Sequence, residues 1–327
     1  MNRRKFLAGI AWGLFWACLP ASSRAGLING FAAMGASETQ GTTYSGSWVP
    51  YLALDRGLNF GPGMSYNRAI GGSDTRDLLN AGQHTQVASL VASGSVDVPF
   101  LFIGGLDVPP VALQIILGSL DVNGWSSGVV TRMMTAVDTI LAENPTGMIV
   151  AGVPDMSLVP GAASYAAVAA PVVAAIDLVN QKLKAKVLER NLVFIDTAAA
   201  MRDLNASPFV VGGVTINMTT GSSNPRNFFV DNIHPGTVGN GYFANLMLTA
   251  LNEGYGAEYD LFSDQHILMR AGLSSSYTGE TSNINYAQYI YVTPVPEASS
   301  WVLMLGASVV GFIGMRRKQR TRVSISS

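Results

Sequence analysis

The sequence predicts an α/β fold in which a parallel sheet lies between two layers of helices. Short apolar runs rich in β-branched residues alternate with longer segments of helical period, and this alternation is typical of a parallel sheet wrapped by helices. Without its two apolar ends, the chain has a body of about 270 residues, which fits one large α/β domain as easily as two small ones. This length is ample for a sizeable core.

Four short apolar runs are the predicted strands, at residues 27–34, 100–103, 147–153 and 192–195. Between them, amphipathic patterns predict helices over residues 126–144 and 164–190, and Pro171 is expected to interrupt the second. A final helix is expected over residues 238–252. The predicted domain covers residues 26–272. The Ser-, Thr- and Tyr-rich stretch over residues 273–294 has little apolar periodicity and is interpreted mostly as a spacer.

The chain begins with a predicted signal peptide over residues 1–25. Arg3, Arg4 and Lys5 precede an apolar run, and small residues follow at Ser23 and Ala25. The paired arginines before an apolar pair resemble the twin-arginine export signal, which implies export of the folded protein. A retained N-terminal anchor is the alternative, although the apolar run is shorter than the roughly 20 residues of a spanning helix.

The C-terminal end carries a predicted transmembrane segment over residues 298–315. This run has no charged residue and the basic sequence RRKQRTR follows it, so the main body is expected outside the cytoplasm. The order of VPE, apolar span and Arg-rich tail over residues 295–320 resembles the PEP-CTERM sorting signal, although Ala298 stands where the commonest form has a second proline. This resemblance implies cleavage near Pro296-Glu297 by an exosortase-type enzyme and transfer to the cell surface. A single-pass tail anchor is the alternative.

Composition excludes several other kinds of chemistry. The only cysteine, Cys18, lies in the predicted signal peptide, so neither disulfides nor thiol chemistry are expected in the mature chain. A net charge of −1 with 13% charged residues gives no basic patch for a phosphate backbone, which argues against a nucleic-acid partner. No group of His, Cys and carboxylate residues has metal-ligand spacing, and we predict neither a metal nor a cofactor.

Two segments that follow predicted strands present candidate catalytic groups. In FAAMGASETQG, Ser37 comes just after the first strand, and open α/β sheets place their ligands at the carboxyl ends of their strands. The alternative is a helix N-cap serine with Glu38 in the first turn. In YNRAIGGSDTRDLL, Gly71 and Gly72 let backbone N–H groups approach a substrate, as an oxyanion site requires. A tight strand-to-helix turn is the alternative there.

Two further segments complete the set. FLFIGGLDVPP again runs from an apolar strand into a Gly-rich turn, with Asp107 beside it. DNIHPGTVGN contains Asp231 and His234. Read alone, this last segment is as consistent with a surface histidine in a Pro-Gly turn as with a catalytic base held by an acid.

Taken in order, the four segments resemble the SGNH, or GDSL, family of serine hydrolases, over residues 30–241. The family pattern is a GDS serine near the start, a glycine block after the second strand, a G-x-N-D block after the third and a D-x-x-H pair near the end. GVPDMSLVP, at residues 152–160, is similar to the family's loop after the next strand. The resemblance implies a three-layer α/β/α fold with a flavodoxin-like strand order.

The resemblance also implies roles for individual residues. Ser37 is then the nucleophile, His234 the general base and Asp231 the acid that orients the imidazole, while the backbone N–H groups of Ser37 and Gly72 stabilise the oxyanion. This assignment agrees with the chemistry, because a serine hydroxyl is a poor nucleophile until a base takes its proton, and a carboxylate fixes the tautomer of that base.

Two positions depart from the family pattern. Ala36 replaces the Asp of GDS, which supports the turn and does not perform the chemistry. Leu106 stands where an Asn would supply the side-chain donor of the oxyanion hole, and the loss of one such donor costs on the order of 10²–10³ in turnover. We expect Asn67 or Ser73, in the second segment, to supply a substitute donor.

The remaining histidines, and the aromatic residues near Ser37, show weaker evidence of a role in the site. His84 and His266 are predicted to be solvated or structural. Tyr44, Trp48 and Tyr51 are expected either to line an acyl or sugar pocket or to pack in the core.

The sequence therefore predicts an exported serine esterase, membrane-anchored or sorted to the cell surface, that hydrolyses carboxylic esters. Acyl or acetyl groups on extracellular polysaccharide are the favoured substrates, because the sorting signal is associated with polysaccharide. The nearest enzymatic alternative is a lipase or lysophospholipase-like activity. The alternative from another class is a catalytically silent, carbohydrate-binding surface protein, which Ala36 and Leu106 favour.

Overall fold

The computed structural model of the chain describes residues 28–206, 208–282 and 284–293. The predicted signal peptide and sorting signal, with its apolar segment at 298–315, lie outside these residues. Within the described part, no single helix has both the length and the apolar composition of a membrane span. The 3₁₀ helix η7 (Pro160–Val168) and helix α6 (Ala170–Leu188), bent by 109° where they meet, reach that length and composition only as a pair.

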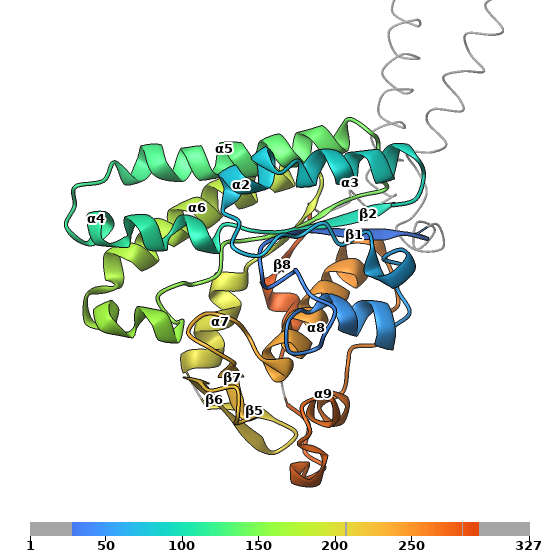
Figure 1. The fold of residues 1–327 in the computed structure, drawn as a ribbon, viewed down its shortest axis with the longest axis vertical. Helices are drawn as coiled ribbons and strands as arrows, with labels where there is room; N and C mark the ends of the chain where they lie inside the picture. The colour runs from blue at the N-terminus through green and yellow to red at the C-terminus, as the bar shows by residue number, and fades with distance from the viewer. Residues whose placement is uncertain (1–27, 207, 283, 294–327) are drawn as a thin grey trace, which may run out of the picture. The chain divides into compact units, whose positions relative to one another are not determined.

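A five-stranded sheet with the order β1-β2-β3-β4-β8 forms the centre of the fold (Figure 1). Four parallel strands are followed at one edge by an antiparallel fifth: β1 (Phe31–Gly35), β2 (Val98–Phe102), β3 (Ile149–Ala151), β4 (Val193–Ile195) and β8 (Ile290–Tyr291). Every residue of the four parallel strands is buried, as expected where helices cover both faces of a sheet. The predicted α/β class with a parallel sheet is confirmed, and each of these strands overlaps its predicted run.

The segment before Gly71 lies along the free edge of β1. The Arg68 N–H donates to the Ala33 carbonyl (2.7 Å) and the Ile70 N–H to the Gly35 carbonyl (3.2 Å), beside an isolated parallel bridge between Ala33 and Asn67. If this segment is counted as a strand, it comes second along the chain, after β1 and before β2. The five parallel strands, numbered by their place along the chain, then lie side by side in the flavodoxin-like order 2-1-3-4-5. As a result, the glycine segment that follows it reaches the carboxyl end of β1.

Helices cover both faces of the sheet (Figure 1). One face carries four helices, in which α5 packs against both α3 and α6: α2 (Thr75–Asn80), α3 (Gln83–Ala92), α5 (Val122–Leu141) and α6. The other face carries α7 (Thr197–Ala206) and α8 (Thr237–Tyr255), and α8 packs against β3 and β4. The predicted break near Pro171 falls at Ala169, so that Pro171 occupies the first turn of α6, where its missing N–H costs no hydrogen bond.

Two short helical segments connect the carboxyl ends of the strands to the helices of the first face. After β2, the chain forms η5 (Gly105–Asp107), η6 (Pro109–Val111) and α4 (Ala112–Ile116). After β3, it forms η7. Asp107, in η5, is buried against α2 and α5, where its carboxylate accepts hydrogen bonds from the Thr75 backbone and hydroxyl (3.0 and 2.7 Å) and from Arg132 (3.0 Å). Asp107 therefore fastens the third glycine segment to the start of α2.

Of the spacer predicted over residues 273–294, the described residues 273–282 and 284–293 are part of the fold. They contain η8 (Ser274–Ser276), η9 (Tyr286–Tyr289) and β8, which extends the sheet beyond β4. Tyr286 and Tyr289 are buried, and the Tyr289 hydroxyl donates to Asp203 (2.8 Å). The sequence pattern missed this segment because aromatic rings spaced among polar residues provide the burial, instead of an aliphatic period.

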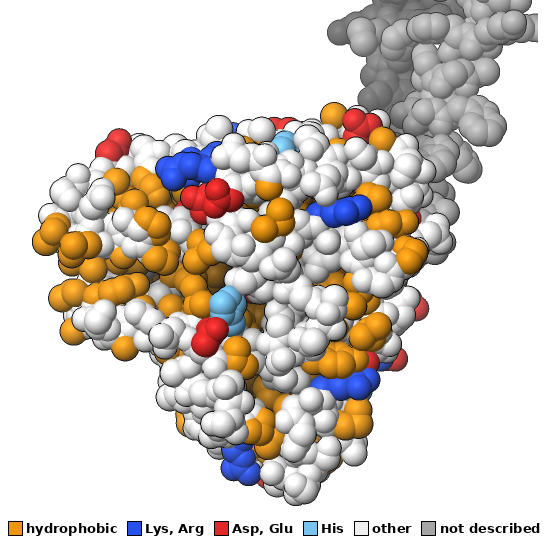
Figure 2. Space-filling view, viewed as in Figure 1, with side chains coloured by type: hydrophobic (Ala, Val, Ile, Leu, Met, Phe, Trp, Pro, Cys, Tyr) orange, Lys and Arg blue, Asp and Glu red, His pale blue; other side chains and the backbone are white. Residues whose placement is uncertain are grey.

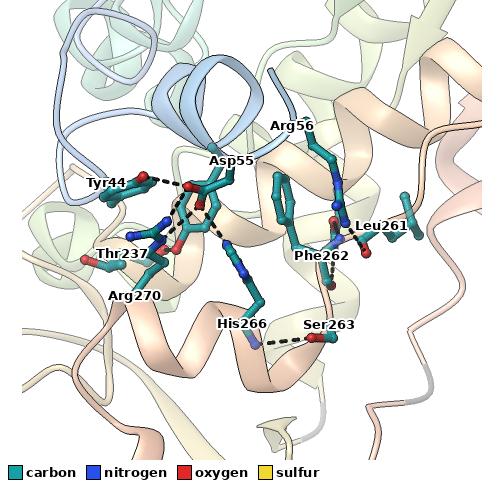
Figure 3. A network of polar contacts seen from close by, with 11 residues as sticks. Tyr44, Asp55, Arg56, Thr237, Leu261, Phe262, Ser263, His266 and Arg270 are labelled. Carbon is teal, nitrogen blue, oxygen red and sulfur yellow. Dashed lines mark hydrogen bonds and ion pairs between the residues drawn. The ribbon is translucent and has the colours of Figure 1, made fainter. Parts of the chain in front are cut away.

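A polar network fastens helix α9 (Asp264–Arg270) to η3 (Tyr51–Asp55), as Figure 3 shows. The buried Asp55 carboxylate accepts hydrogen bonds from the Tyr44 hydroxyl (2.8 Å), the His266 ring (2.7 Å) and the Arg270 guanidinium (3.0 Å from Nε). Burial acts to raise the pKa of Asp55, but the bonds from these three partners outweigh it and lower the pKa below its ordinary value. His266 therefore has a structural role.

The aromatic residues that follow Ser37 belong to this framework and to the core. Trp48 and Tyr51 are fully buried, with Trp48 packed edge-on against Phe100 (5.3 Å between ring centroids). The ring of Tyr44 contacts that of Tyr51 at 5.0 Å. Core packing is thus the correct one of the two expectations for these rings.

Candidate active site

Ser37 stands at the carboxyl end of β1, where the strand turns sharply. At the last strand residue, Gly35, a Cβ atom would lie 2.0 Å from a carbonyl oxygen of β2, so only glycine permits this approach. The N–H groups of Thr39 and Gln40 both donate to the Ala36 carbonyl (3.2 and 2.9 Å). The chain therefore makes a helical turn directly after the strand, and this turn presents the Ser37 side chain at the carboxyl end of the sheet.

The structure brings Ser37, His234 and Asp231 together in one hydrogen-bonded line. His234 Nε2 lies 2.8 Å from Ser37 Oγ, and His234 Nδ1 lies 2.7 Å from Asp231 Oδ2. With a proton on Nδ1, the ring donates to the carboxylate and leaves Nε2 free to accept the serine proton. The side chains of His234 and Asp231 are 37% and 53% exposed, so the line lies at the surface of the protein and not beneath it.

A tight loop between β7 (Asn227–Phe229) and α8 holds Asp231 and His234 in place. The Val230 N–H donates to the His234 carbonyl (2.9 Å), which closes the loop. Asp231 Oδ1 accepts the backbone N–H groups of Ile233 (2.9 Å) and His234 (2.8 Å). Partial burial acts to raise the pKa of the Asp231 carboxyl, but these two N–H groups and the imidazole lower it below its ordinary value. Asp231 is thus held as a carboxylate facing the imidazole.

β7 belongs to a small second sheet that the sequence analysis did not predict. This sheet contains β5 (Phe209–Val211), β6 (Val214–Thr220) and β7. β5 and β6 pair antiparallel, whereas β6 and β7 pair parallel. Because the Asp231 loop follows β7 directly, the small sheet positions the loop.

Backbone N–H groups beside Ser37 are available to an oxyanion. A Cβ atom on Gly71 would lie 3.7 Å from the Ser37 Cβ, which places the second glycine segment against the serine. The Gly71 N–H itself donates to the Gln40 side chain (2.7 Å). Among the described residues, no acceptor pairs with the N–H of Ser37 or of Gly72. Gly72 has a φ of 80°, a left-handed conformation that favours glycine.

The two residues expected to substitute for the oxyanion Asn do not face Ser37. The Asn67 amide donates to the Thr39 carbonyl (2.7 Å), while its oxygen accepts the Ala69 N–H (3.2 Å). Ser73 is buried and lies within hydrogen-bond distance of Gln83 (3.4 Å). Asn67 thus joins the glycine segment to the turn after β1, and Ser73 lies against α3. Both side chains are engaged with these partners, so the expectation of a donor at either position is wrong.

A narrow cavity opens beside Ser37 and His234. Its volume is about 50 Å³, room for a few water molecules. Its walls come from the carboxyl ends of the strands and from helices α7 and α8, and they are mostly apolar: Phe102, Leu106, Met156, Met201, Phe229 and Phe243. Leu106 thus lies in the wall, where its side chain offers no hydrogen-bond donor.

Glu38 also lines this cavity, and the sequence analysis assigned it no role in the chemistry. Burial raises the pKa of the Glu38 carboxyl to about 7, while its own N–H, the Ala36 N–H and the nearby His234 act in the opposite direction. A carboxyl with a pKa in this range beside a candidate nucleophile is itself a candidate functional group. The available signal in the sequence was an acidic residue directly after the serine of an otherwise apolar segment.

Apolar side chains are exposed on two segments that follow β2 and β3. Leu113 and Leu117, in and just after α4, are 66% and 69% exposed, and Val168 at the end of η7 is 52% exposed. Figure 2 shows hydrophobic side chains gathered over this part of the face, around a hollow. η7 contains no charged residue. We call this exposed apolar surface of α4 and η7 the rim, and it is suited to apolar groups.

Neither a protein-family model nor a curated protein matches the chain. Among solved structures, the chain is similar to a catalytic mutant of an acetylxylan esterase from Geobacillus stearothermophilus, with 16% identity over 70% of this chain and 95% of that one and a TM-score of 0.44. It is also similar to an alpha/beta hydrolase from the metagenome of Lake Arreo, Spain, with 16% identity over 75% and 96% of the two chains and a TM-score of 0.42.

Proposed function

We propose that the chain is an SGNH-type serine esterase that hydrolyses carboxylic esters through an acyl-enzyme on Ser37. The observation that carries the proposal is the line from Ser37 Oγ to His234 Nε2 (2.8 Å) and from His234 Nδ1 to Asp231 (2.7 Å). The order of nucleophile, base and orienting acid is the one that activates a serine hydroxyl. The N–H groups of Ser37 and Gly72 and the cavity beside them support the same reaction, since an acyl carbonyl needs both a donor and a space.

In the first half of the reaction, Ser37 Oγ attacks the ester carbonyl carbon while His234 Nε2 takes the serine proton. The carbonyl oxygen becomes an oxyanion and accepts hydrogen bonds from the N–H groups of Ser37 and Gly72. The C–O bond to the alcohol then breaks, and His234 returns the proton to the leaving alkoxide. The acyl group remains on Ser37 as an ester.

In the second half, water takes the place of the alcohol. His234 accepts a proton from the water as it attacks the acyl carbonyl, and a second oxyanion forms in the same position. The bond to Ser37 Oγ then breaks, the proton passes from His234 to the serine oxygen, and the carboxylic acid leaves. Asp231 stays ionised throughout and stabilises the imidazolium in both halves.

Labelling with a fluorophosphonate probe tests the proposal directly. We expect the purified protein to bind one equivalent of probe at Ser37, because the probe phosphonylates, with loss of fluoride, a serine whose hydroxyl is activated by a base. Intact-mass measurement followed by peptide mapping identifies the labelled residue. The matched control is Ser89→Ala, a change at an exposed serine of α3, which contributes no residue to the cavity wall.

Two outcomes contradict the proposal. A wild-type protein that remains unlabelled favours the catalytically silent carbohydrate-binding alternative. Labelling that persists in Ser37→Ala shows that another residue is the nucleophile. Loss of the label in Ser37→Ala together with its retention in Ser89→Ala supports the proposed role.

The cavity and the rim favour acyl groups of different length. The small volume beside Ser37 favours a short acyl group, such as the acetyl groups of extracellular polysaccharide that the sorting signal suggests. The exposed Leu113, Leu117 and Val168 favour the second candidate, a lipase-like activity on esters with long apolar chains.

A pair of esters of the same alcohol separates these two candidates. We expect kcat/KM to be at least about tenfold higher for the acetyl ester than for the octanoyl ester, because each methylene that finds no space in the cavity loses binding energy in the transition state. Initial rates on p-nitrophenyl acetate and p-nitrophenyl octanoate, below the concentration at which the latter aggregates, give the ratio. A preference for the octanoyl ester supports the lipase-like candidate instead.

A further inference from the structure

Glu38 occupies an unusual place for an acidic side chain. It follows the proposed nucleophile directly and lines the cavity together with apolar side chains of β2, α7 and α8: Phe102, Met201 and Phe243. Of the described residues that line the cavity, Glu38 and His234 are the only ionisable ones. Glu38 is half-buried, and a carboxylate among such neighbours loses part of its hydration, so the uncharged acid is favoured.

The charged groups around Glu38 do not reverse this preference. His234 is the nearest one, and its effect on Glu38 is smaller than that of burial. Asp155 belongs to the loop that contributes Pro154 and Met156 to the cavity wall, but its carboxylate is bound by Arg202 at 2.5 Å. The sum of these effects is a pKa of about 7 for Glu38. Below that pH the side chain is mostly a carboxylic acid, which has one O–H to donate.

The backbone next to Glu38 is the part of the site where an oxyanion is expected. The N–H groups of Ala36 and of Glu38 face the Glu38 carboxyl, and the N–H of Ser37, the implied oxyanion donor, lies between them along the chain. Leu106 lines the same cavity at the position where the SGNH pattern has an Asn donor. Leu106, which has no hydrogen-bond donor, and Glu38, whose acid form has an O–H, therefore line the same small cavity.

We propose that the protonated Glu38 carboxyl donates a hydrogen bond to the oxyanion of the tetrahedral intermediate and so replaces the side-chain donor missing at Leu106. The inference rests on the proposed esterase reaction. The proton stays on Glu38 throughout, so the sequence of bond-making and bond-breaking steps is unchanged. A neutral carboxylic acid in an apolar site is a strong donor to a developing negative charge, whereas a carboxylate in the same place repels it.

This role predicts a loss of kcat on the alkaline side. Activity falls as pH rises through about 7, because Glu38, whose pKa is raised to that value, then becomes a carboxylate and no longer donates. In Glu38→Gln the amide donates at every pH, so we expect the fall on the alkaline side to disappear while kcat below pH 7 stays within about tenfold of wild type.

The apolar variant Glu38→Leu tests the size of the contribution. We expect it to lower kcat by about 10²–10³-fold with little change in KM, since the donor acts in the transition state and not on the bound ester. In the double variant Glu38→Leu/Leu106→Asn, the new amide supplies a donor from the other wall. We expect most of the lost kcat to return, without the alkaline fall.

Stability and labelling measurements separate this proposal from the proposed function and from misfolding. Because its folded pKa is raised, Glu38 lowers the stability of the wild type as pH rises from about 4.5 to about 7. Glu38→Gln should therefore have a higher unfolding temperature than wild type at pH 8 and about the same one at pH 4. All variants should still be labelled by a fluorophosphonate at Ser37, and failure of the wild type to label overturns the esterase itself. With labelling intact, an unchanged kcat in Glu38→Leu, or an alkaline fall that persists in Glu38→Gln, overturns the role of Glu38.

Discussion

Alanine at Ser37 and alanine at His234 are each expected to lower kcat for p-nitrophenyl acetate by about 10⁵–10⁶-fold, and the double variant is expected to lose no more than either single one. The nucleophile and its base act as one unit, joined here by the 2.8 Å contact between Ser37 Oγ and His234 Nε2. Without the base, the hydroxyl keeps its proton; without the hydroxyl, the base has no proton to take. Removing the second partner therefore costs nothing further.

Steady-state rates of the three variants and the wild type at one pH give the comparison. The residual rate should remain above the uncatalysed one, since the N–H groups of Ser37 and Gly72 still bind the oxyanion when water attacks directly. His84→Ala is a suitable control because it removes another histidine, from helix α3, that does not line the cavity. Losses that multiply in the double variant mean that the two residues act independently, and such a result contradicts a shared proton transfer.

The parts of the fold that the sequence predicts are those with a strong local pattern. The four parallel strands are short, mostly apolar runs that are buried over their whole length, so hydrophobicity alone locates them. Helix α8, which was predicted over residues 238–252, is located in the same way because nearly all of its residues are buried. By contrast, β8 has only two residues, Ile290 and Tyr291, and it exists because β4 offers a free edge. No local pattern contains that information.

The candidate site likewise has features that the sequence predicts and features that it does not. The four segments, taken in their order along the chain, predicted that Ser37, Asp231 and His234 lie together, although each segment read alone left another interpretation open. The donor hypotheses for Asn67 and Ser73 failed because both side chains have other partners in the fold: Asn67 donates to the Thr39 carbonyl, and Ser73 lies within hydrogen-bond distance of Gln83. The protonation state of Glu38 could not be predicted from the sequence, since its raised pKa depends on burial among residues from distant elements.

Asparagine at Asp231 is expected to lower kcat by about 10³-fold although it has the same shape as the native residue. Asp231 Oδ1 accepts two backbone N–H groups, from Ile233 (2.9 Å) and His234 (2.8 Å), and Oδ2 accepts the imidazole N–H (2.7 Å). In asparagine the carbonyl oxygen must occupy the position that faces the two backbone donors, because an amide NH₂ there has no acceptor. The NH₂ group then faces His234 Nδ1.

This orientation reverses the tautomer of the base. Nδ1 has to accept a hydrogen bond from the asparagine, so the ring proton moves to Nε2, and Nε2 donates to Ser37 Oγ instead of accepting its proton. For a buried triad acid the same change lowers kcat by about 10⁴-fold. We expect a smaller loss here because the Asp231 side chain is 53% exposed, so that water can partly stabilise the productive tautomer.

Three variants distinguish this electrostatic role from a structural one. Asp231→Ala removes the acceptor without imposing a tautomer, so we expect its kcat to be no lower than that of Asp231→Asn. If Asp231 were needed only to shape the loop, asparagine would be the better replacement and Asp231→Asn would have the higher kcat. Asp260→Asn, at an exposed site, controls for the loss of one charge. Rates should be measured together with the unfolding temperature of each variant. An Asp231→Asn enzyme that retains more than about a third of the wild-type kcat is incompatible with the tautomer argument, because even a solvent-exposed carboxylate contributes more than that to an imidazolium in a triad.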